Sequence, residues 1–331
     1  MHGSGSAAAH PIPEQAQMAS ALTLENDHLR VVIDPSRGGK CLSLYSRRTG
    51  TEWLLPPLRA YAAAKNTGGF EEWDGGGFDE CLPTVAATAT APDHGELWRN
   101  RWQDLGPGAN GNQIALRTTA CNGALVLERR ARLEGACLIL HYSVANQVDA
   151  AQSLLYSAHP LLRVEAGDRI SLPAEVTRVR VEGSPLYSAA DTIPWPSPSQ
   201  SDLSIVGPPD GSLAAKLFAG PLRLGWCALF RPSLGEGVEL TFSADTLPYL
   251  GLWICRAAWP EAAPRKQYTV AFEPTSAPHD SLTVAEQDGT AWRLLPGERR
   301  EWKLAFRLIR QGEEHDRQPR SANQDAARET A

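Results

Sequence analysis

Apolar and polar residues alternate in short runs along most of this 331-residue chain. Residues 22–24 and 29–33 place an apolar side chain at about every second position, and a polar turn at 26–28 separates the two runs. A second turn signal, containing glycine and proline, covers residues 34–39. A period of two is typical of strands that bury one face, so the chain is predicted to begin with paired β-strands.

The same alternation continues toward the other end of the chain. Residues 125–133 and 137–143 predict a hairpin that turns about Glu134-Gly135, and residues 302–308 alternate cleanly. Helical spacing is scarce, because 25 prolines and 28 glycines interrupt the chain, and only residues 59–65 predict a short helix. The sequence has no glycine fingerprint between a strand and a helix, which argues against a nucleotide-binding fold. We therefore predict an all-β protein of large antiparallel sheets with few short helices.

Two long segments, 66–84 and 184–209, are predicted to be irregular. Loops of this length in a compact domain are usually functional or mobile. The first segment fits two interpretations: a solvated flexible loop, or the rim of a binding site in which aromatic rings stack and carboxylates bind hydroxyl groups. The candidates for such a rim are Trp73, Phe78, Asp79 and Glu80.

Both ends of the chain differ in composition from its middle. Residues 1–19 are small and polar and predict a disordered lead-in, and residues 312–331 are charged, lack large apolar residues and predict a disordered tail. Residues 20–311 remain as a single β-sandwich domain, a length that suits one large all-β unit.

Charge and cysteine usage exclude several classes of function. A net charge of -6 argues against a nucleic-acid partner. No apolar run approaches the roughly 18 residues of a membrane helix, and residues 1–19 lack the apolar core of a signal peptide, so we expect a cytoplasmic protein without a membrane partner. The six cysteines have no CxxC spacing, which predicts buried free thiols and gives a zinc site little support.

A carboxylate and two histidines form the candidate chemistry. Glu273 follows a β-branched and aromatic run, and Pro274 is expected to stop that strand, so the carboxylate would face a cleft from a strand end. His94 and His159 lie in separate predicted strands or turns and could complete an acid–base set. The alternative is that Glu273 only ends a strand and His159 only packs beside Pro160.

Four passages, taken together and in order, resemble the aldose 1-epimerase, or galactose mutarotase-like, superfamily. They are residues 31–44, 92–102, 157–160 and 272–275, which contain an early hairpin, a His-Gly pair, a His-Pro pair and a late glutamate. The resemblance spans nearly the whole predicted domain. It implies a β-supersandwich of the galactose mutarotase type and the interconversion of the α and β anomers of an aldose.

The resemblance also implies roles for three side chains. Glu273 would take the proton of the anomeric hydroxyl as general base, His159 would protonate the ring oxygen as an imidazolium, and His94 would hold the ring oxygen or a neighbouring hydroxyl. Each well-placed acid or base typically accelerates such a reaction roughly 10²–10⁴-fold. No metal or organic cofactor is implied.

The substrate-binding residues depart from the family pattern. Where many members have an early arginine, residues 81–85 contain none, so Arg99 is the candidate substitute. Leu161 and Leu162 replace the two aromatic residues that often follow the His-Pro pair. The substrate-binding candidates are Arg99, Asp79, Glu80, Trp73 and Asp245. The partner is expected to be a small-molecule sugar other than simple galactose or glucose, bound by a monomer or homodimer.

Two further hypotheses fit the same residues. The chain could be a non-catalytic sugar-binding protein that keeps the fold, since the substrate-binding set differs. It could also be a β-sandwich enzyme that cleaves polysaccharides or glycosides, which needs a second acid near Glu273. Glu72, Asp79 and Glu80 are the candidates for that acid.

Overall fold

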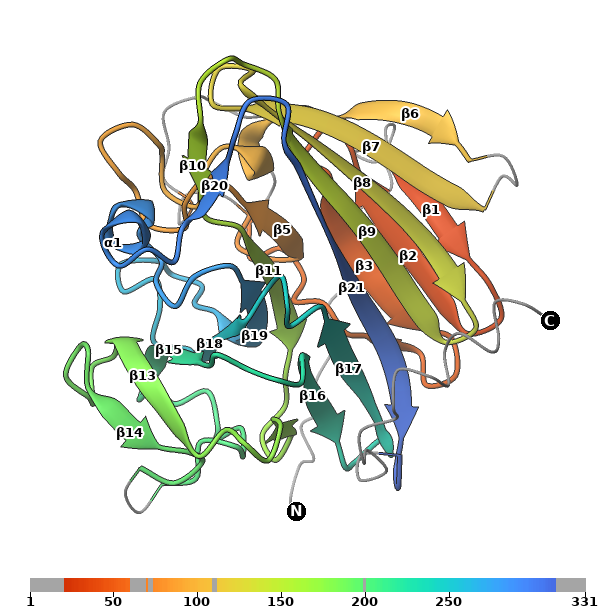
Figure 1. Cartoon of the computed structure of the whole chain (residues 1–331). Helices are drawn as coiled ribbons and strands as arrows, with labels where there is room; N and C mark the ends of the chain where they lie inside the picture. The colour runs from red at the N-terminus through yellow and green to blue at the C-terminus, as the bar shows by residue number, and fades with distance from the viewer. Residues whose placement is uncertain (1–20, 60–69, 71–73, 109–111, 199–200, 314–331) are drawn as a thin grey trace, which may run out of the picture.

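Two large antiparallel sheets account for the alternation in the sequence (Figure 1). The computed structural model describes residues 21–59, 70, 74–108, 112–198 and 201–313. The larger sheet consists of β1 (Leu22–Glu25), β2 (Leu29–Asp34), β3 (Lys40–Ser46), β4 (Thr51–Glu52), β5 (Phe78–Cys81), β11 (Ser157–Arg163), β13 (Arg178–Gly183), β14 (Thr192–Pro194), β15 (Ala214–Ala219), β18 (Tyr249–Arg256) and β19 (Tyr268–Thr275). Its order is β1-β2-β3-β5-β11-β19-β18-β15-β13-β14, with β4 paired to β3.

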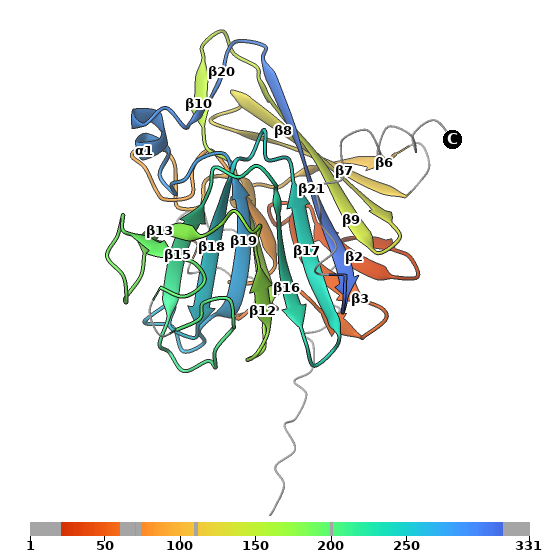
Figure 2. The same cartoon turned by 60° about the horizontal axis from the view of Figure 1, so that its bottom comes forward.

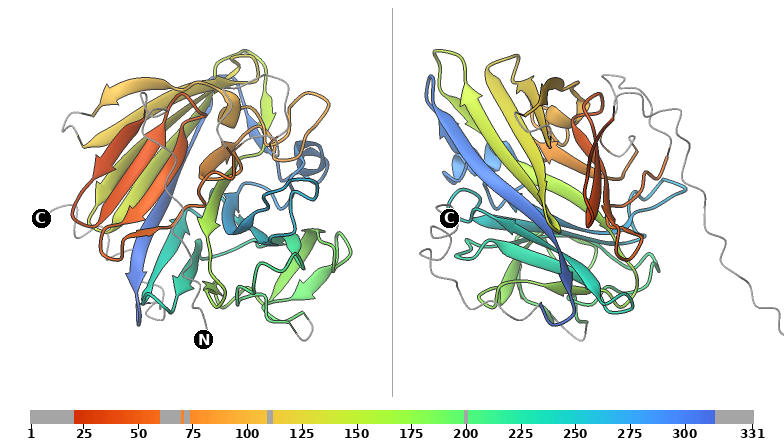
Figure 3. Two further views of the ribbon diagram at one scale, coloured as in Figure 1. Left: turned by 180° about the vertical axis from the view of Figure 1, so that it is seen from behind. Right: turned by 90° about the vertical axis from the view of Figure 1, so that its right-hand side faces the viewer.

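The second sheet packs against the first and has the order β12-β16-β17-β21-β9-β8-β7-β6. Its strands are β6 (Gln103–Pro107), β7 (Gln113–Ala120), β8 (Leu125–Glu134), β9 (Cys137–Asn146), β12 (Arg169–Ser171), β16 (Trp226–Arg231), β17 (Glu236–Phe242) and β21 (Arg299–Arg310). Figure 3 shows β1–β3 lying beside β6–β9. In Figure 2, β15, β18 and β19 of the larger sheet lie side by side, as do β16, β17 and β21 of the second sheet. A small sheet pairs β10 (Gln152–Leu154) with β20 (Trp292–Leu294).

Helix is scarce in the described residues. The 3₁₀ turn η3 (Leu97–Arg99) and the helix α1 (Leu282–Gln287) are each one or two turns long. Ser281 caps α1, because its side chain accepts a hydrogen bond from the backbone N–H of Val284. The prediction of an all-β protein with few short helices is therefore confirmed. The helix predicted at 59–65 lies outside the described residues beyond Arg59.

The hydrophobic core lies between the two large sheets. The predicted hairpin about Glu134-Gly135 is formed by β8 and β9, where Glu134 pairs with Cys137. In β21 the inward side chains of Trp302, Leu304 and Phe306 are buried, as the alternation predicted. All six cysteines are free thiols, four of them buried.

Two sequence expectations about irregular segments are wrong in part. Segment 66–84 contains β5, which lies in the middle of the larger sheet between β3 and β11. Phe78 on this strand is 1% exposed in the core, so it cannot stack on a ligand at a rim. Segment 184–209 contains the edge strand β14. The glycines at 75–77 indicated a loop, so the short buried strand that begins directly after them was not predicted.

Candidate active site

The candidate site lies on one face of the larger sheet, where a row of residues crosses the strands. Asp79 of β5 is directly opposite His159 of β11, and Glu273 of β19 is directly opposite Gly251 of β18. β11 also pairs with β19, and the paired positions before and after His159 place this residue opposite Glu273. Because side chains of directly opposite residues share a face, the register alone brings these groups together.

The Glu273 and His159 side chains face each other without forming a hydrogen bond. Nε2 of His159 is 3.9 Å from Oε1 of Glu273, beyond hydrogen-bond reach, and both side chains are buried. Neither Oε1 of Glu273 nor Nδ1 of His159 has a hydrogen-bond partner. Oε1 is therefore free to accept a hydrogen bond from a hydroxyl group placed beside Nε2 of His159.

Glu273 does not lie at a strand end, which corrects the sequence expectation. β19 continues through Pro274 to Thr275, and Pro274 pairs with Leu250 near the end of the strand. The carboxylate consequently projects from the face of a central strand, where the neighbouring strands fix its direction.

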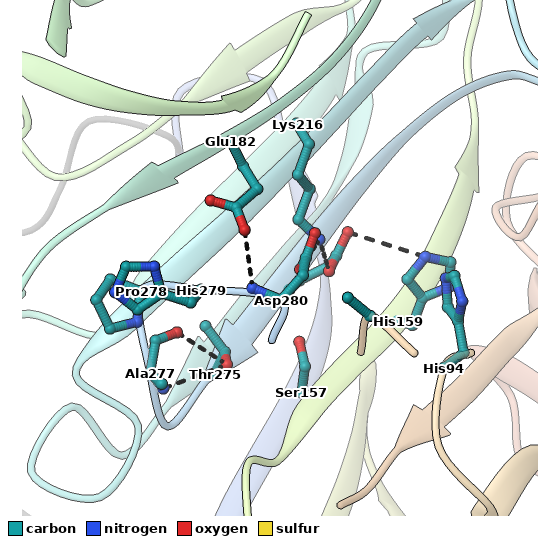
Figure 4. Close-up of polar contacts among 12 residues, drawn as sticks. His94, Ser157, His159, Glu182, Lys216, Thr275, Ala277, Pro278, His279 and Asp280 are labelled. Atoms are coloured by element: carbon teal, nitrogen blue, oxygen red, sulfur yellow. Dashed lines mark hydrogen bonds and ion pairs between the residues drawn. The ribbon is translucent and has the colours of Figure 1, made fainter. Parts of the chain in front are cut away.

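His94 reaches the same place from the loop before η3. Its backbone has a φ of 57°, in the left-handed region. Its ring stands at 85° to that of His159 with centroids 5.0 Å apart (Figure 4). The His94 ring also stacks on that of Phe70, with centroids 3.8 Å apart. Nδ1 of His94 is 3.0 Å from a carboxylate oxygen of Asp93. The structure thus places the three candidate catalytic side chains side by side, while their roles stay a prediction.

The next residue, Gly95, fixes this loop against the sheet. A Cβ at Gly95 would lie 2.2 Å from the carbonyl oxygen of Leu82. Only glycine allows such a close approach together with its positive φ of 71°. The His-Gly pair in the sequence therefore has a structural reason for its glycine.

Lys216 of β15 is the main site residue that sequence analysis missed. Its ammonium group contacts Oε2 of Glu273 and lies 3.2 Å from Oδ1 of Asp280 (Figure 4). The backbone N–H of Asp280 in turn donates to Oε1 of Glu182 at 3.2 Å. One signal was present in the sequence, since Lys216 is the single charged residue in the apolar run of β15.

The burial of this cluster shifts its proton affinities. Burial raises the pKa of Glu273, although Lys216 offsets part of that increase. Burial lowers the pKa of His159 well below its ordinary value of 6.5, and the nearby His94, Lys216 and Lys40 lower it further. Burial therefore favours the neutral imidazole of His159 at neutral pH, and its role as general acid stays a prediction.

Burial alone would lower the pKa of Lys216, but the charges of Asp280 and Glu273 outweigh it and raise that pKa. The ammonium group therefore stays charged across the working pH range.

A second buried lysine borders the row on the other side. Nζ of Lys40 lies 2.5 Å from Oδ1 of Asp74, 2.9 Å from Oδ2 of Asp79 and 2.9 Å from the carbonyl of Gly76. Burial raises the pKa of Asp79 to about 6, against the opposing pull of Lys40. Asp79 faces the site as an ion-paired group, and its role in sugar binding stays a prediction.

Glu80 faces the opposite side of the sheet from Asp79. It is fully buried between the sheets, where it accepts hydrogen bonds from Nη1 of Arg129 at 2.9 Å and from the hydroxyls of Tyr142 and Tyr156, each at 2.7 Å. This placement corrects the expectation that Glu80 binds substrate hydroxyls or acts as a second catalytic acid. Adjacent residues of a strand point to opposite faces, and the sequence did not reveal the strand.

The remaining candidates are more scattered. The Arg99 guanidinium lies over the indole of Trp98 at 4.7 Å. Asp245 is exposed on the turn between β17 and β18. Trp73 and Glu72 lie outside the described residues. Phe70, which contacts both His94 and His159, was not a candidate.

A groove of about 470 Å³ lies elsewhere, on the outer face of the second sheet. It is lined by Arg130, His141 and Lys303, which are cross-strand neighbours on β8, β9 and β21. Acidic neighbours balance part of its charge, since Arg130 lies 3.8 Å from Glu128. Its side chains are largely solvent-exposed, and it has no buried acid–base pair comparable to Glu273 and His159.

Across the described ranges, no group of three or more histidine, cysteine, aspartate or glutamate side chains is arranged to hold a metal ion. In the part of the chain that the structure describes, no helix is long and apolar enough to cross a membrane.

The two packed sheets form a β-sandwich of the galactose mutarotase-like fold, which solved structures share at low sequence identity. A Synechocystis protein is 17% identical over 92% of this chain and 100% of its own, with a TM-score of 0.67. An Escherichia coli protein named for an inferred aldose 1-epimerase activity is 16% identical over 88% and 99% of the two chains, with a TM-score of 0.65.

A galactose mutarotase-like protein from Lactobacillus casei is also similar. It is 16% identical over 87% of this chain and 100% of its own, with a TM-score of 0.64. No protein-family model and no curated protein sequence matches the chain. At sequence identities this low, the similarity shows a shared fold and does not transfer the roles of individual residues to this chain.

Proposed function

We propose that this protein is an aldose 1-epimerase, an isomerase that interconverts the α and β anomers of an aldose or modified aldose. The observation that carries the proposal is the gap of 3.9 Å between Oε1 of Glu273 and Nε2 of His159, with His94 beside it. Both side chains are buried, and Oε1 lacks a hydrogen-bond partner. The names of the structural neighbours point in the same direction.

The proposed reaction consists of two proton transfers. Glu273 takes the proton of the anomeric hydroxyl, the bond between C1 and the ring oxygen breaks, and His159 donates a proton to the ring oxygen. The resulting open-chain aldehyde rotates about C1–C2. The two transfers then reverse and close the ring as the other anomer, so the protein ends with its original protons.

The lowered pKa of His159 determines which form of the protein reacts. The reactive form has Glu273 ionised and His159 as the imidazolium, whose proton is strongly acidic because burial disfavours the charged ring. As pH falls, protonation of His159 creates this form and protonation of Glu273 removes it. We expect a bell-shaped dependence of kcat/KM on pH with its maximum on the acid side of neutrality.

The test is NMR anomer exchange across a panel of aldoses, uronic acids and modified sugars, with Glu273→Gln beside the wild type. Loss of the base should slow exchange about 10²–10⁴-fold. Glu286→Gln, on the exposed face of α1, is the matched control and should leave the rate unchanged. If the wild type binds a sugar without accelerating exchange of any, the protein is a sugar-binding protein. If acceleration survives Glu273→Gln, the role of Glu273 is wrong.

A further inference from the structure

Lys216 occupies a position that core packing alone does not explain. Its neighbours on β15 are all apolar, and the strand is buried. A buried ion pair gives little net stability compared with apolar residues of similar volume. An ammonium group held at this point, in contact with the candidate base, therefore calls for a functional reason.

We infer that Lys216 is a positioning residue, which fixes Oε2 of Glu273 so that Oε1 faces His159 and which keeps the carboxylate in its ionised, basic form. The inference rests on the proposed acid–base function of Glu273. Asp280 is the second partner of the ammonium group, at 3.2 Å, and restrains it from the loop after β19.

The path from Lys216 to Glu273 depends on Gly251. In the larger sheet β18 lies between β15 and β19, so the Lys216 side chain must cross β18 to reach Glu273. Glu273 is directly opposite Gly251, which has no side chain there. A Cβ at Gly251 would lie 3.1 Å from Cβ of Glu273 and 3.4 Å from Oε2, beside the oxygen that Lys216 contacts. The glycine leaves room for the ion pair.

The charges around Glu273 give the inference a direction in pH. Lys216 of β15, His159 of β11, Asp280 of the loop after β19 and His94 of the loop before η3 act on it, and the Cys81 thiol of β5 is close enough to respond to its charge. Lys216 and His94 favour the carboxylate, whereas Asp280 disfavours it.

The pH–rate profile separates positioning from a merely structural role. In Lys216→Met, both limbs of the kcat/KM profile should move to higher pH by about one to three units, since Lys216 lowers the pKa of Glu273 and of His159. Lys216→Arg should restore much of the wild-type profile. Asp280→Asn should move the acid limb the other way, to lower pH. Lys303→Met, on the outer face of the second sheet, is the matched control.

A measurement without turnover distinguishes failure of this inference from failure of the proposed function. The Glu273 carboxyl can be titrated by ¹³C NMR in labelled protein, and its midpoint should rise in Lys216→Met and fall in Asp280→Asn. Unchanged midpoints in both variants would overturn the inference even if the wild type proves an active epimerase. If the midpoints shift in the variants but the wild type accelerates no sugar, Lys216 does hold the carboxylate in its ionised form, while the proposed function, and with it the catalytic purpose of that contact, is overturned. If Lys216→Met does not fold, Asp280→Asn decides by the same criterion.

Discussion

Replacing Glu80 by alanine should destabilise the fold without altering the proposed chemistry. The change removes the buried partner of Arg129, whose Nη1 lies 2.9 Å from Oε1. It also removes the acceptor of the Tyr142 and Tyr156 hydroxyls. Breaking a buried ion pair by deleting one partner costs about 3–5 kcal/mol. Two unpaired hydroxyls add roughly 1 kcal/mol each, so we expect a loss of about 5–7 kcal/mol in unfolding free energy.

A loss of that size is a large share of the roughly 5–15 kcal/mol that stabilises most domains. It should lower Tm on the order of 10–20 °C, measured by circular dichroism or calorimetry. The rate of anomer exchange per folded molecule, measured well below Tm, should stay within about twofold of the wild type. That expectation follows because Glu80 and the Glu273–His159 pair lie on opposite faces of the larger sheet.

The matched variant replaces both members of the pair. In Glu80→Met with Arg129→Met, no charge is left buried without a partner, so much of the lost stability should return. Lost exchange activity in Glu80→Ala with an unchanged Tm would refute the reasoning. Glu80 would then contribute to substrate binding, as the sequence had suggested.

Two further changes test the site itself. Phe70→Leu removes the ring that stacks on His94 at 3.8 Å, and should lower kcat/KM about 3- to 10-fold with little change in Tm; an unchanged kcat/KM would exclude Phe70 from the site. Asp79→Asn should become more stable relative to wild type as pH rises from about 4 to 7, measured by urea unfolding. The pKa of Asp79 is about 6 in the folded state against 3.8 in the unfolded state, so the wild type loses stability as this carboxyl ionises over that pH window. A difference in stability that does not depend on pH would contradict the raised pKa.

The sequence predicted the class of the fold because a period of two is a local property of the chain. The hairpin of β8 and β9 and the opening pair of β1 and β2 follow from neighbouring residues alone. The same local rule failed at β5, where three glycines precede a strand of four residues. Without a visible strand, nothing separated Asp79, which faces the site, from Glu80, which faces the core.

Only those site residues that lie in a recognisable sequence motif could be predicted. Glu273 and His159 come together through the pairing of β11 with β19, His94 joins them from the loop before η3, and their grouping rested on a resemblance. Lys216 joins them only because β15 is two strands away from β19, with Gly251 between. That order is a long-range property of the sheet, and no local pattern near residue 216 contains it.

The row across the larger sheet combines fixed charges at its ends with exchangeable protons at its centre. Lys40 and Lys216 are each held by two carboxylates, which raise the pKa of both ammonium groups and keep them charged. Between them, burial moves the pKa of His159 down and that of Glu273 up, so burial makes His159 a better proton donor and Glu273 a better proton acceptor. Those are the roles that the proposed ring opening gives to the two side chains. The two lysines therefore contribute fixed positive charges to the site, because their ammonium groups keep their protons while Glu273 and His159 exchange theirs.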